Sequence, residues 1–139
     1  METFPLKVLT MQGTAFEGEV LSLSIPTEKG PVVIEHGYTN YMAALSPAGV
    51  MTIVTPNKTE YYAVFGGVID VRKGGATKLY VEEINNGFEI DLARAIAARD
   101  RNLDRINRRP EGIDIQRAQI KLQKALVRIS VKQLAEGGR

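Results

Sequence analysis

The sequence predicts an all-β sandwich over residues 1–87, followed by a C-terminal antiparallel αα-hairpin over residues 88–139, hence two small domains. Three observations predict this division. Short runs of β-branched and aromatic residues, separated by turn formers, fill the first part, and helical spacing of apolar residues begins after it. The charge changes at the same place. Six Lys and Arg against nine Asp and Glu give −3 in the first part, and twelve against seven give +5 in the second.

A period of two indicates the strands of the first part. Residues 21–25 alternate apolar and hydroxyl side chains, as a strand with one buried face does. Further strand-like runs occupy residues 32–34, 50–54, 61–65, 68–71 and 79–81. No helical pattern separates these runs, so we expect antiparallel strands rather than parallel βαβ units. Gly66 and Gly67, between two of the runs, predict a bulge or a close approach of two backbones.

Helical spacing predicts two helices in the second part. The first runs from Asp91 to Arg108 and is broken before Pro110; the second starts near Asp114 as N-cap and runs toward Leu134. Because the break is short, the helices should fold back on each other. The expected apolar stripes are Leu92, Ala95, Ile96, Leu103 and Ile106 on the first helix, and Ala118, Leu122, Ala125, Leu126 and Ile129 on the second. These alanine-rich stripes bury little apolar area, so we expect a hairpin that can repack elsewhere.

The composition excludes several classes of chemistry. The chain has no cysteine and a single histidine, His36, which we interpret as structural or surface-exposed. No carboxylate pair or nucleophile–base pair stands out, so we expect neither catalysis by the chain alone nor a metal site. No run approaches the roughly 18 apolar residues of a membrane-spanning helix, and no secretory signal is visible. These features predict a soluble, cytoplasmic, non-secreted protein.

Basic residues on the second helix recur at helical spacing. The intervals of four, three, four and four residues put all of them on one face. These residues are Arg117, Lys121, Lys124, Arg128 and Lys132. The face is either a solvated polar surface or a surface that docks onto an acidic segment of a partner.

A second group of charges lies on the first helix. Asp91 and Arg94 are three residues apart, and Arg101 follows two turns later. Two guanidiniums could bind phosphates while the carboxylate accepts from a donor group of a nucleotide. The alternative is that Asp91 is favoured at the helix N-terminus by the helix dipole and pairs locally with Arg94.

A free-standing nucleic-acid or anion-binding module is the competing function class. The basic hairpin would be its binding surface. Every Phe and Tyr precedes residue 89, so the basic face lacks the aromatic residues on which bases stack. We therefore expect no nucleic-acid partner.

The order of motifs resembles the epsilon subunits of bacterial F-type ATP synthases over nearly the full length. Residues 64–71 (VFGGVIDV) are similar to that family's FxGGFxxV segment, and residues 89–95 (EIDLARA) resemble its I/L-D-x-x-R-A motif. The second helix, around Arg117, Lys124 and Arg128, resembles the family's last helix.

The resemblance implies a non-catalytic subunit of the central stalk, which rotates and couples proton translocation to ATP synthesis. Its sandwich would bind the gamma subunit and the c-ring. Its hairpin would either fold down on the sandwich or extend toward the alpha and beta subunits and inhibit ATP hydrolysis. The protein would be peripheral, on the cytoplasmic face of the bacterial cell membrane, and membrane-associated only through the complex.

The resemblance also implies a regulatory ATP site in the folded-down hairpin, with no required cofactor. Its residues would be Asn85, Asp91, Arg94, Ala95, Arg101, Lys124 and Arg128. Asn85 stands where relatives use an acid, with Glu82 and Glu83 displaced from that position, so weaker ATP binding is expected. The basic face, from Arg117 to Lys132, would meet an acidic stretch of the beta subunit.

Overall fold

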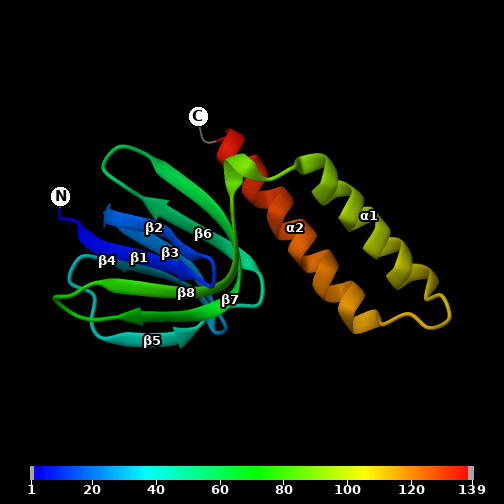
Figure 1. Ribbon diagram of the computed structural model, residues 1–139, viewed down its shortest axis with the longest axis horizontal. Coiled ribbons are helices and arrows are strands. Elements are labelled where there is room, and N and C mark those ends of the chain that lie inside the picture. The colour runs from blue at the N-terminus through cyan, green and yellow to red at the C-terminus, as the bar shows by residue number, and fades with distance from the viewer. Residues whose placement is uncertain (1, 138–139) are drawn as a thin grey trace.

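The computed structural model describes residues 2–137, which form eight strands, one short 3-10 helix and two α-helices (Figure 1). The strands are β1 (Phe4–Thr10), β2 (Gly13–Val20), β3 (Ser22–Thr27), β4 (Gly30–Glu35), β5 (Tyr41–Ala44), β6 (Gly49–Val54), β7 (Thr59–Val71) and β8 (Thr77–Asn86). The helices are η1 (Gly87–Glu89), α1 (Leu92–Arg108) and α2 (Ile115–Gly137). The predicted fold class, a β-sandwich followed by an αα-hairpin, is confirmed.

The strands form a continuous hydrogen-bonded sheet in the order β2-β1-β8-β7-β6-β3-β4, with β5 paired to β7. This sheet folds over one core, because side chains from strands far apart in that order are buried in a single cluster. The fully buried members include Leu6, Leu23, Ile53, Ile69 and Leu79. Most strand pairs are antiparallel, as expected, but β1 runs parallel to β8 over four residue pairs.

The glycine pair within β7 is where that strand changes its partner. The two runs predicted on either side of Gly66 and Gly67 form one strand, which pairs with β6 before the glycines and with β5 after them. Both glycines have positive φ, 74° and 134°. A side chain on Gly67 would collide with the backbone carbonyl of Tyr80 on β8. The predicted close approach of two backbones is therefore confirmed.

An aspartate caps the start of each helix, and the cap predicted at Asp114 is confirmed. Asp91 caps α1, and Asp114, directly before α2, accepts a hydrogen bond from the Arg117 backbone N–H at 3.0 Å. Between the helices, Arg109 adopts the left-handed conformation with φ 47°, and Pro110 follows it. Helix α2 continues three residues beyond the predicted end at residue 134 and ends at Gly137.

The seam between α1 and α2 is only partly the predicted apolar stripe. Ala95 on α1 is buried, and so are Ala118, Ala125 and Ile129 on α2. Leu103 and Leu126 were expected in the stripe, but 39% and 45% of their surface is exposed, so they lie at its margin.

Asn102 occupies the interior of this seam instead. The residue is buried, and its Nδ2 donates to the Ala98 carbonyl at 2.7 Å, while its Oδ1 has no hydrogen-bond partner. A buried polar atom without a partner lowers the stability of the packing around it. The seam is therefore weaker than an aliphatic one would be.

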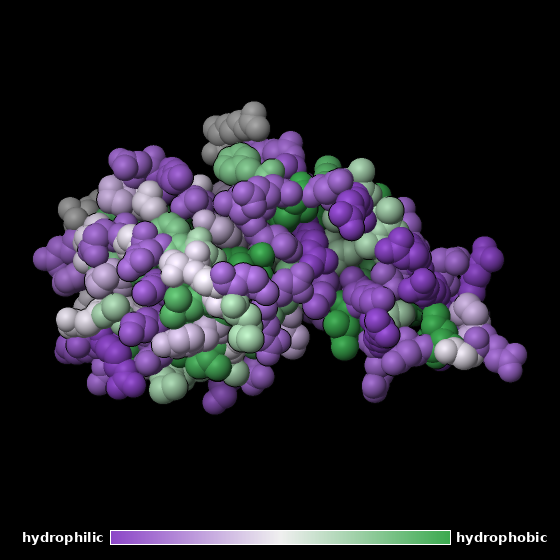
Figure 2. Space-filling model, viewed as in Figure 1, coloured by the Kyte–Doolittle hydropathy of each residue, from purple (hydrophilic) through white to green (hydrophobic). Residues whose placement is uncertain are grey.

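Helix α2 lies between the sandwich and α1 (Figure 1). Val131 on α2 is fully buried and belongs to a small cluster with Ala48, Ala63, Phe65 and Ile90. On the face that Figure 2 shows, the hairpin is mainly hydrophilic, with a few apolar side chains among the polar ones. No helix among the described residues is long and apolar enough to cross a membrane.

Candidate functional site

A cleft of about 530 Å³ opens where the end of β8, the start of α1 and the middle of α2 meet. Six of the seven residues predicted for a nucleotide site line it: Asn85, Asp91, Arg94, Ala95, Arg101 and Arg128. The remaining lining residues are Ile84, Asn86, Glu89, Ile90, Ala98 and Ala125. Lys124, the seventh predicted residue, is not part of the lining.

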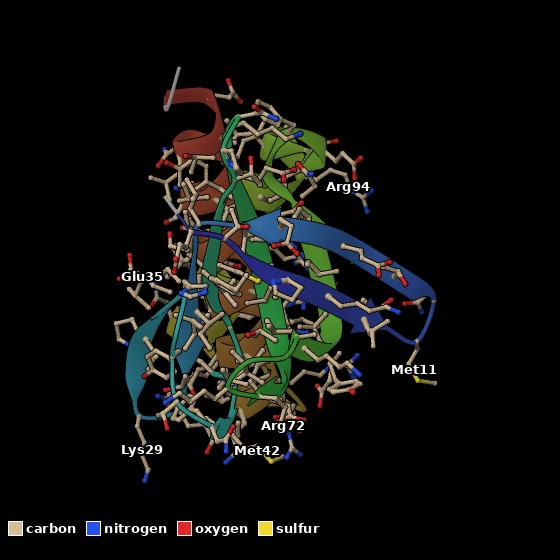
Figure 3. The ribbon with its side chains drawn as sticks, turned by 90° about the vertical axis from the view of Figure 1, so that its left-hand side faces the viewer. Met11, Lys29, Glu35, Met42, Arg72 and Arg94 are labelled. Atoms are coloured by element: carbon tan, nitrogen blue, oxygen red, sulfur yellow. The ribbon has the colours of Figure 1, made fainter. Side chains whose placement is uncertain are left out.

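Helix α1 supplies two arginines to the cleft. Asp91 Oδ1 accepts from the Arg94 backbone N–H at 3.1 Å, which fixes the first turn of the helix. Arg101 follows Arg94 by seven residues, two turns along the same side of the helix. Figure 3 shows the Arg94 side chain projecting outward from α1. Asp91 thus caps the helix, the local role that the sequence left open, and also faces the cleft.

Helix α2 contributes Arg128, whose guanidinium is held on three sides. Its Nη2 donates to Glu83 Oε2 at 2.8 Å, and its Nε donates to Asn85 Oδ1 at 2.9 Å. Its central carbon lies 4.6 Å from the centroid of the Phe65 ring, within the range of a cation–π contact. Lys124 Nζ lies 3.3 Å from Glu83 Oε1 and 5.3 Å from the same ring.

Glu83 belongs to this group of residues although no motif or spacing predicts it. The resemblance leaves Glu82 and Glu83 displaced from the position of Asn85, but Glu83 and Asn85 both contact Arg128. Residues two apart on a strand point to the same side of the sheet, so these two side chains belong together and Glu82 does not. The period of two along β8 is the signal that places Glu83 beside Asn85, while their contact with Arg128 depends on how α2 docks.

Three of the five cations predicted for partner docking contact the sandwich or η1 in this structure. Lys124 and Arg128 contact Glu83, and Lys132 Nζ donates to the Phe88 carbonyl at 3.0 Å. The other two, Arg117 and Lys121, are exposed. The basic face therefore exists, but most of it faces inward.

The cleft combines positive charge with a small apolar wall. Among the lining residues, three arginines face two carboxylates, those of Glu89 and Asp91, while Glu83 pairs with Arg128 from outside the lining. Ile90, Ala95 and Ala125 provide the apolar part. Guanidiniums suit phosphate oxygens, and an alanine-lined wall admits a flat ring, so the cleft can bind a nucleotide-sized anion. In the described part of the chain, no cluster of His, Asp and Glu side chains could hold a metal ion.

His36 lies away from this cleft, at the surface. Its Nδ1 is 2.7 Å from Glu2 Oε2, and both side chains are more than half exposed. The expectation of a structural or surface histidine is confirmed.

Comparison with protein families shows the class to which this architecture belongs. Residues 3–82 match the family model described as ATP synthase, Delta/Epsilon chain, beta-sandwich domain. Residues 89–133 match the model for the long alpha-helix domain of the same chain. A β-sandwich that carries a helical hairpin is thus the architecture of a class of ATP synthase subunits.

The chain belongs to the ATP synthase delta/epsilon chain family. It is 32% identical over 131 residues to the ATP synthase epsilon chain of Bacillus velezensis, covering 94% of this chain and 98% of that one. It is 33% identical over 136 residues to the epsilon chain of Bacillus mycoides, covering 96% and 99%. The resemblance found in residues 64–71 and 89–95 is therefore confirmed.

Solved structures show the same fold. A chain of the Euglena gracilis mitochondrial ATP synthase (OSCP/F1/c-ring, rotational state 1) matches with a TM-score of 0.79 at 18% identity, covering 89% of this chain and 78% of that one. A chain of the central stalk and c-ring of the Tetrahymena thermophila mitochondrial ATP synthase matches with a TM-score of 0.58 at 12% identity, covering 96% of each chain. At these identities the likeness establishes the fold.

Proposed function

We propose that the chain is the central-stalk epsilon subunit of a bacterial F-type ATP synthase, a non-catalytic part of the rotor that couples proton translocation to ATP synthesis. Relatives named ATP synthase epsilon chain that match nearly end to end support this role. The fold is shared with chains from structures of mitochondrial complexes that contain a c-ring. The protein would be peripheral on the cytoplasmic face of the cell membrane, attached through the complex.

The two domains divide this role. Residues 1–87 would bind the gamma subunit and the c-ring, and residues 88–139 would regulate ATP hydrolysis. In the extended state the hairpin would reach the alpha and beta subunits, and Arg117, Lys121, Lys124, Arg128 and Lys132 would meet an acidic stretch of beta. Since three of these cations now contact residues 83–88, they cannot serve both surfaces at once. A hairpin that is docked on the sandwich would therefore be unable to inhibit ATP hydrolysis at the same time.

The cleft would bind regulatory ATP while the hairpin is docked. The observation that carries this proposal is the gathering of six predicted residues around one cavity. Arg94, Arg101 and Arg128 would bind the phosphates, and the oxygen of Asp91 that does not cap α1 would accept from a ligand donor. Ala95 leaves room for the ligand. Lys124 would act from the margin of the cleft, as a point charge.

Asn85 makes this site weaker than one with an acid at that position. Its Oδ1 accepts from Arg128, and its Nδ2 donates to the Ile84 carbonyl at 3.1 Å. Both polar groups are therefore already engaged, and neither adds a negative charge for a donor on the ligand.

Calorimetry of the isolated chain with ATP tests the site. We expect a heat of binding at millimolar ATP, and Arg94→Ala should weaken the affinity about tenfold because it removes a charge-assisted hydrogen bond. Arg108→Ala is the matched control, since Arg108 lies on the same helix, outside the cleft, and pairs with Asp104. No heat of binding for the natural sequence would remove the ATP site from the proposal.

ATP hydrolysis by the reconstituted complex tests the regulatory role. The complex is assembled with the full chain or with a chain that ends at residue 88. We expect faster hydrolysis without the hairpin, because nothing then reaches the catalytic subunits. Unchanged hydrolysis in a complex that still synthesises ATP would eliminate inhibition and leave the stalk role.

A further inference from the structure

A single carboxylate joins the two domains beside the cleft. Glu83, on β8, contacts Lys124 and Arg128 on α2, which are 41 and 45 residues away in sequence. Its side chain is 44% exposed, and those of the two cations are 32% and 28% exposed. All three side chains are partly exposed, so each contact should contribute about as much as a surface ion pair does, and the two contacts act together.

The two cations need a negative charge at this place. Lys124 and Arg128 are four residues apart on α2, a spacing at which like charges repel each other. Both cations also lie over the ring of Phe65, which α2 covers when it docks. Without a counter-charge, docking would hold two mutually repelling cations over the same aromatic ring. Glu83 provides that counter-charge from within the chain.

We propose that Glu83 is a built-in anion that holds α2 on the sandwich without any bound nucleotide. We call Glu83 with Lys124 and Arg128 the latch. The Glu83 carboxylate neutralises Lys124 and Arg128, so no anionic ligand is needed to do so. The docked hairpin is then the resting state of the free subunit, and its stability depends on charge.

The latch also affects the cleft, a consequence that depends on the ATP site proposed above. Arg128 has five N–H donors, and the contacts to Glu83 and Asn85 use two of its nitrogens. A phosphate that binds Arg128 must share the guanidinium with Glu83, whose negative charge repels it. Glu83 therefore lowers the affinity of the cleft for polyanions while it stabilises docking.

Hydrogen exchange of the full-length chain tests the latch without any ligand. Glu83→Gln removes the charge and keeps the shape, and Glu82→Gln is the matched control, one residue earlier on the same strand and outside the latch. In Glu83→Gln, we expect the amides of residues 120–135 to exchange about 3- to 10-fold faster than in the natural sequence. In Glu82→Gln, the same amides should exchange at about their natural rates. The acceleration should shrink at high salt, which already screens the latch.

The outcomes separate the two ideas. Natural exchange rates with Glu83→Gln, or equal acceleration by both variants, would overturn the latch. In calorimetry with ATP, tighter binding by Glu83→Gln than by Glu82→Gln supports competition for Arg128, and equal or weaker binding refutes it. If neither variant nor the natural chain binds ATP, the proposed ATP site fails. The latch is then still decided by the exchange rates measured without ligand.

Discussion

Val131 is the apolar anchor of α2 on the sandwich, and shortening it should undock the helix. The side chain is fully buried and packs with Phe65 and its neighbours. Val131→Ala removes two carbon atoms, which costs about 1.6 kcal/mol at about 0.8 kcal/mol each. A residual cavity of about 50 Å³ would add about 1.2 kcal/mol. The docking equilibrium should therefore shift by about 1.6 to 3 kcal/mol.

Hydrogen exchange measures this shift directly. A change of that size corresponds to about 15- to 150-fold more frequent undocking, and the amides of α2 should exchange faster by the same factor. Amides in β1 and β3 should keep their rates, because the buried side chains of these two strands pack in the main sandwich core and not in the cluster around Val131. Leu126→Ala is the control. Leu126 is on the same helix but 45% exposed, so its truncation should change the rates only about twofold.

Equal acceleration by Val131→Ala and Leu126→Ala would refute the reasoning. The helix would then be held by its ends or by charge alone, and burial of Val131 would not decide docking. Faster exchange in the sandwich strands as well would mean that the two domains unfold together.

Three further predictions concern stability. Gly67→Ala should lower the free energy of unfolding in urea by more than about 4 kcal/mol, because a side chain there collides with the β8 backbone; a loss below about 1 kcal/mol would contradict the close approach. Burial, followed by the charge and hydrogen bond of Glu60, raises the pKa of Tyr62 well above its ordinary value. The native state therefore keeps a proton on Tyr62 that the unfolded state releases, so above about pH 10 the free energy of unfolding should fall by about 1.4 kcal/mol per pH unit. Tyr62→Phe should lose this part of the pH dependence. The same slope above pH 10 in both chains would contradict the raised pKa of Tyr62. Asn102→Leu should raise stability by about 1 kcal/mol, since the unpaired Oδ1 disappears, whereas Asn107→Leu at the exposed side of α1 should not; equal melting temperatures of the two variants would refute this.

The helical part of the fold could be predicted because its signals are local. Each signal acts within one turn, and the structure has all three: the helix start at Asp91, the cap at Asp114 and the break at Pro110. Burial at the margins of the apolar stripe could not be predicted in the same way. Leu103 and Leu126 fit helical spacing, but which side of a stripe is covered depends on how the partner helix lies across it.

The strands at the start of the chain show what periodicity cannot find. β2 lies at the sheet edge and exposes much of its length, and the four-residue β5 has no fully buried residue. Neither has a buried face long enough for an alternation to stand out. β1 does alternate, with Phe4, Leu6 and Val8 buried, but Pro5 interrupts the run of strand formers. Which strand pairs with which depends on contacts far apart in sequence.

The cleft residues came from the resemblance to a family, while Glu83 came only from the structure. The spacing of Arg94 and Arg101 left open whether a ligand or a local cap explained them. Their meeting with Arg128 required the hairpin to close against the end of β8. The packing of the hairpin against β8 depends on contacts between residues far apart in sequence, so no local pattern predicts it.

The turn between the helices restricts every shape that the hairpin can take. Pro110 has no amide hydrogen to donate to a preceding carbonyl, and it pushes Arg109 out of the right-handed region. Residues 92–137 therefore cannot straighten into one uninterrupted rod. If the hairpin moves away from the sandwich, the chain keeps a bend near residue 110. The direction of α2, and with it of Lys121 and Arg128, is then independent of the direction of α1.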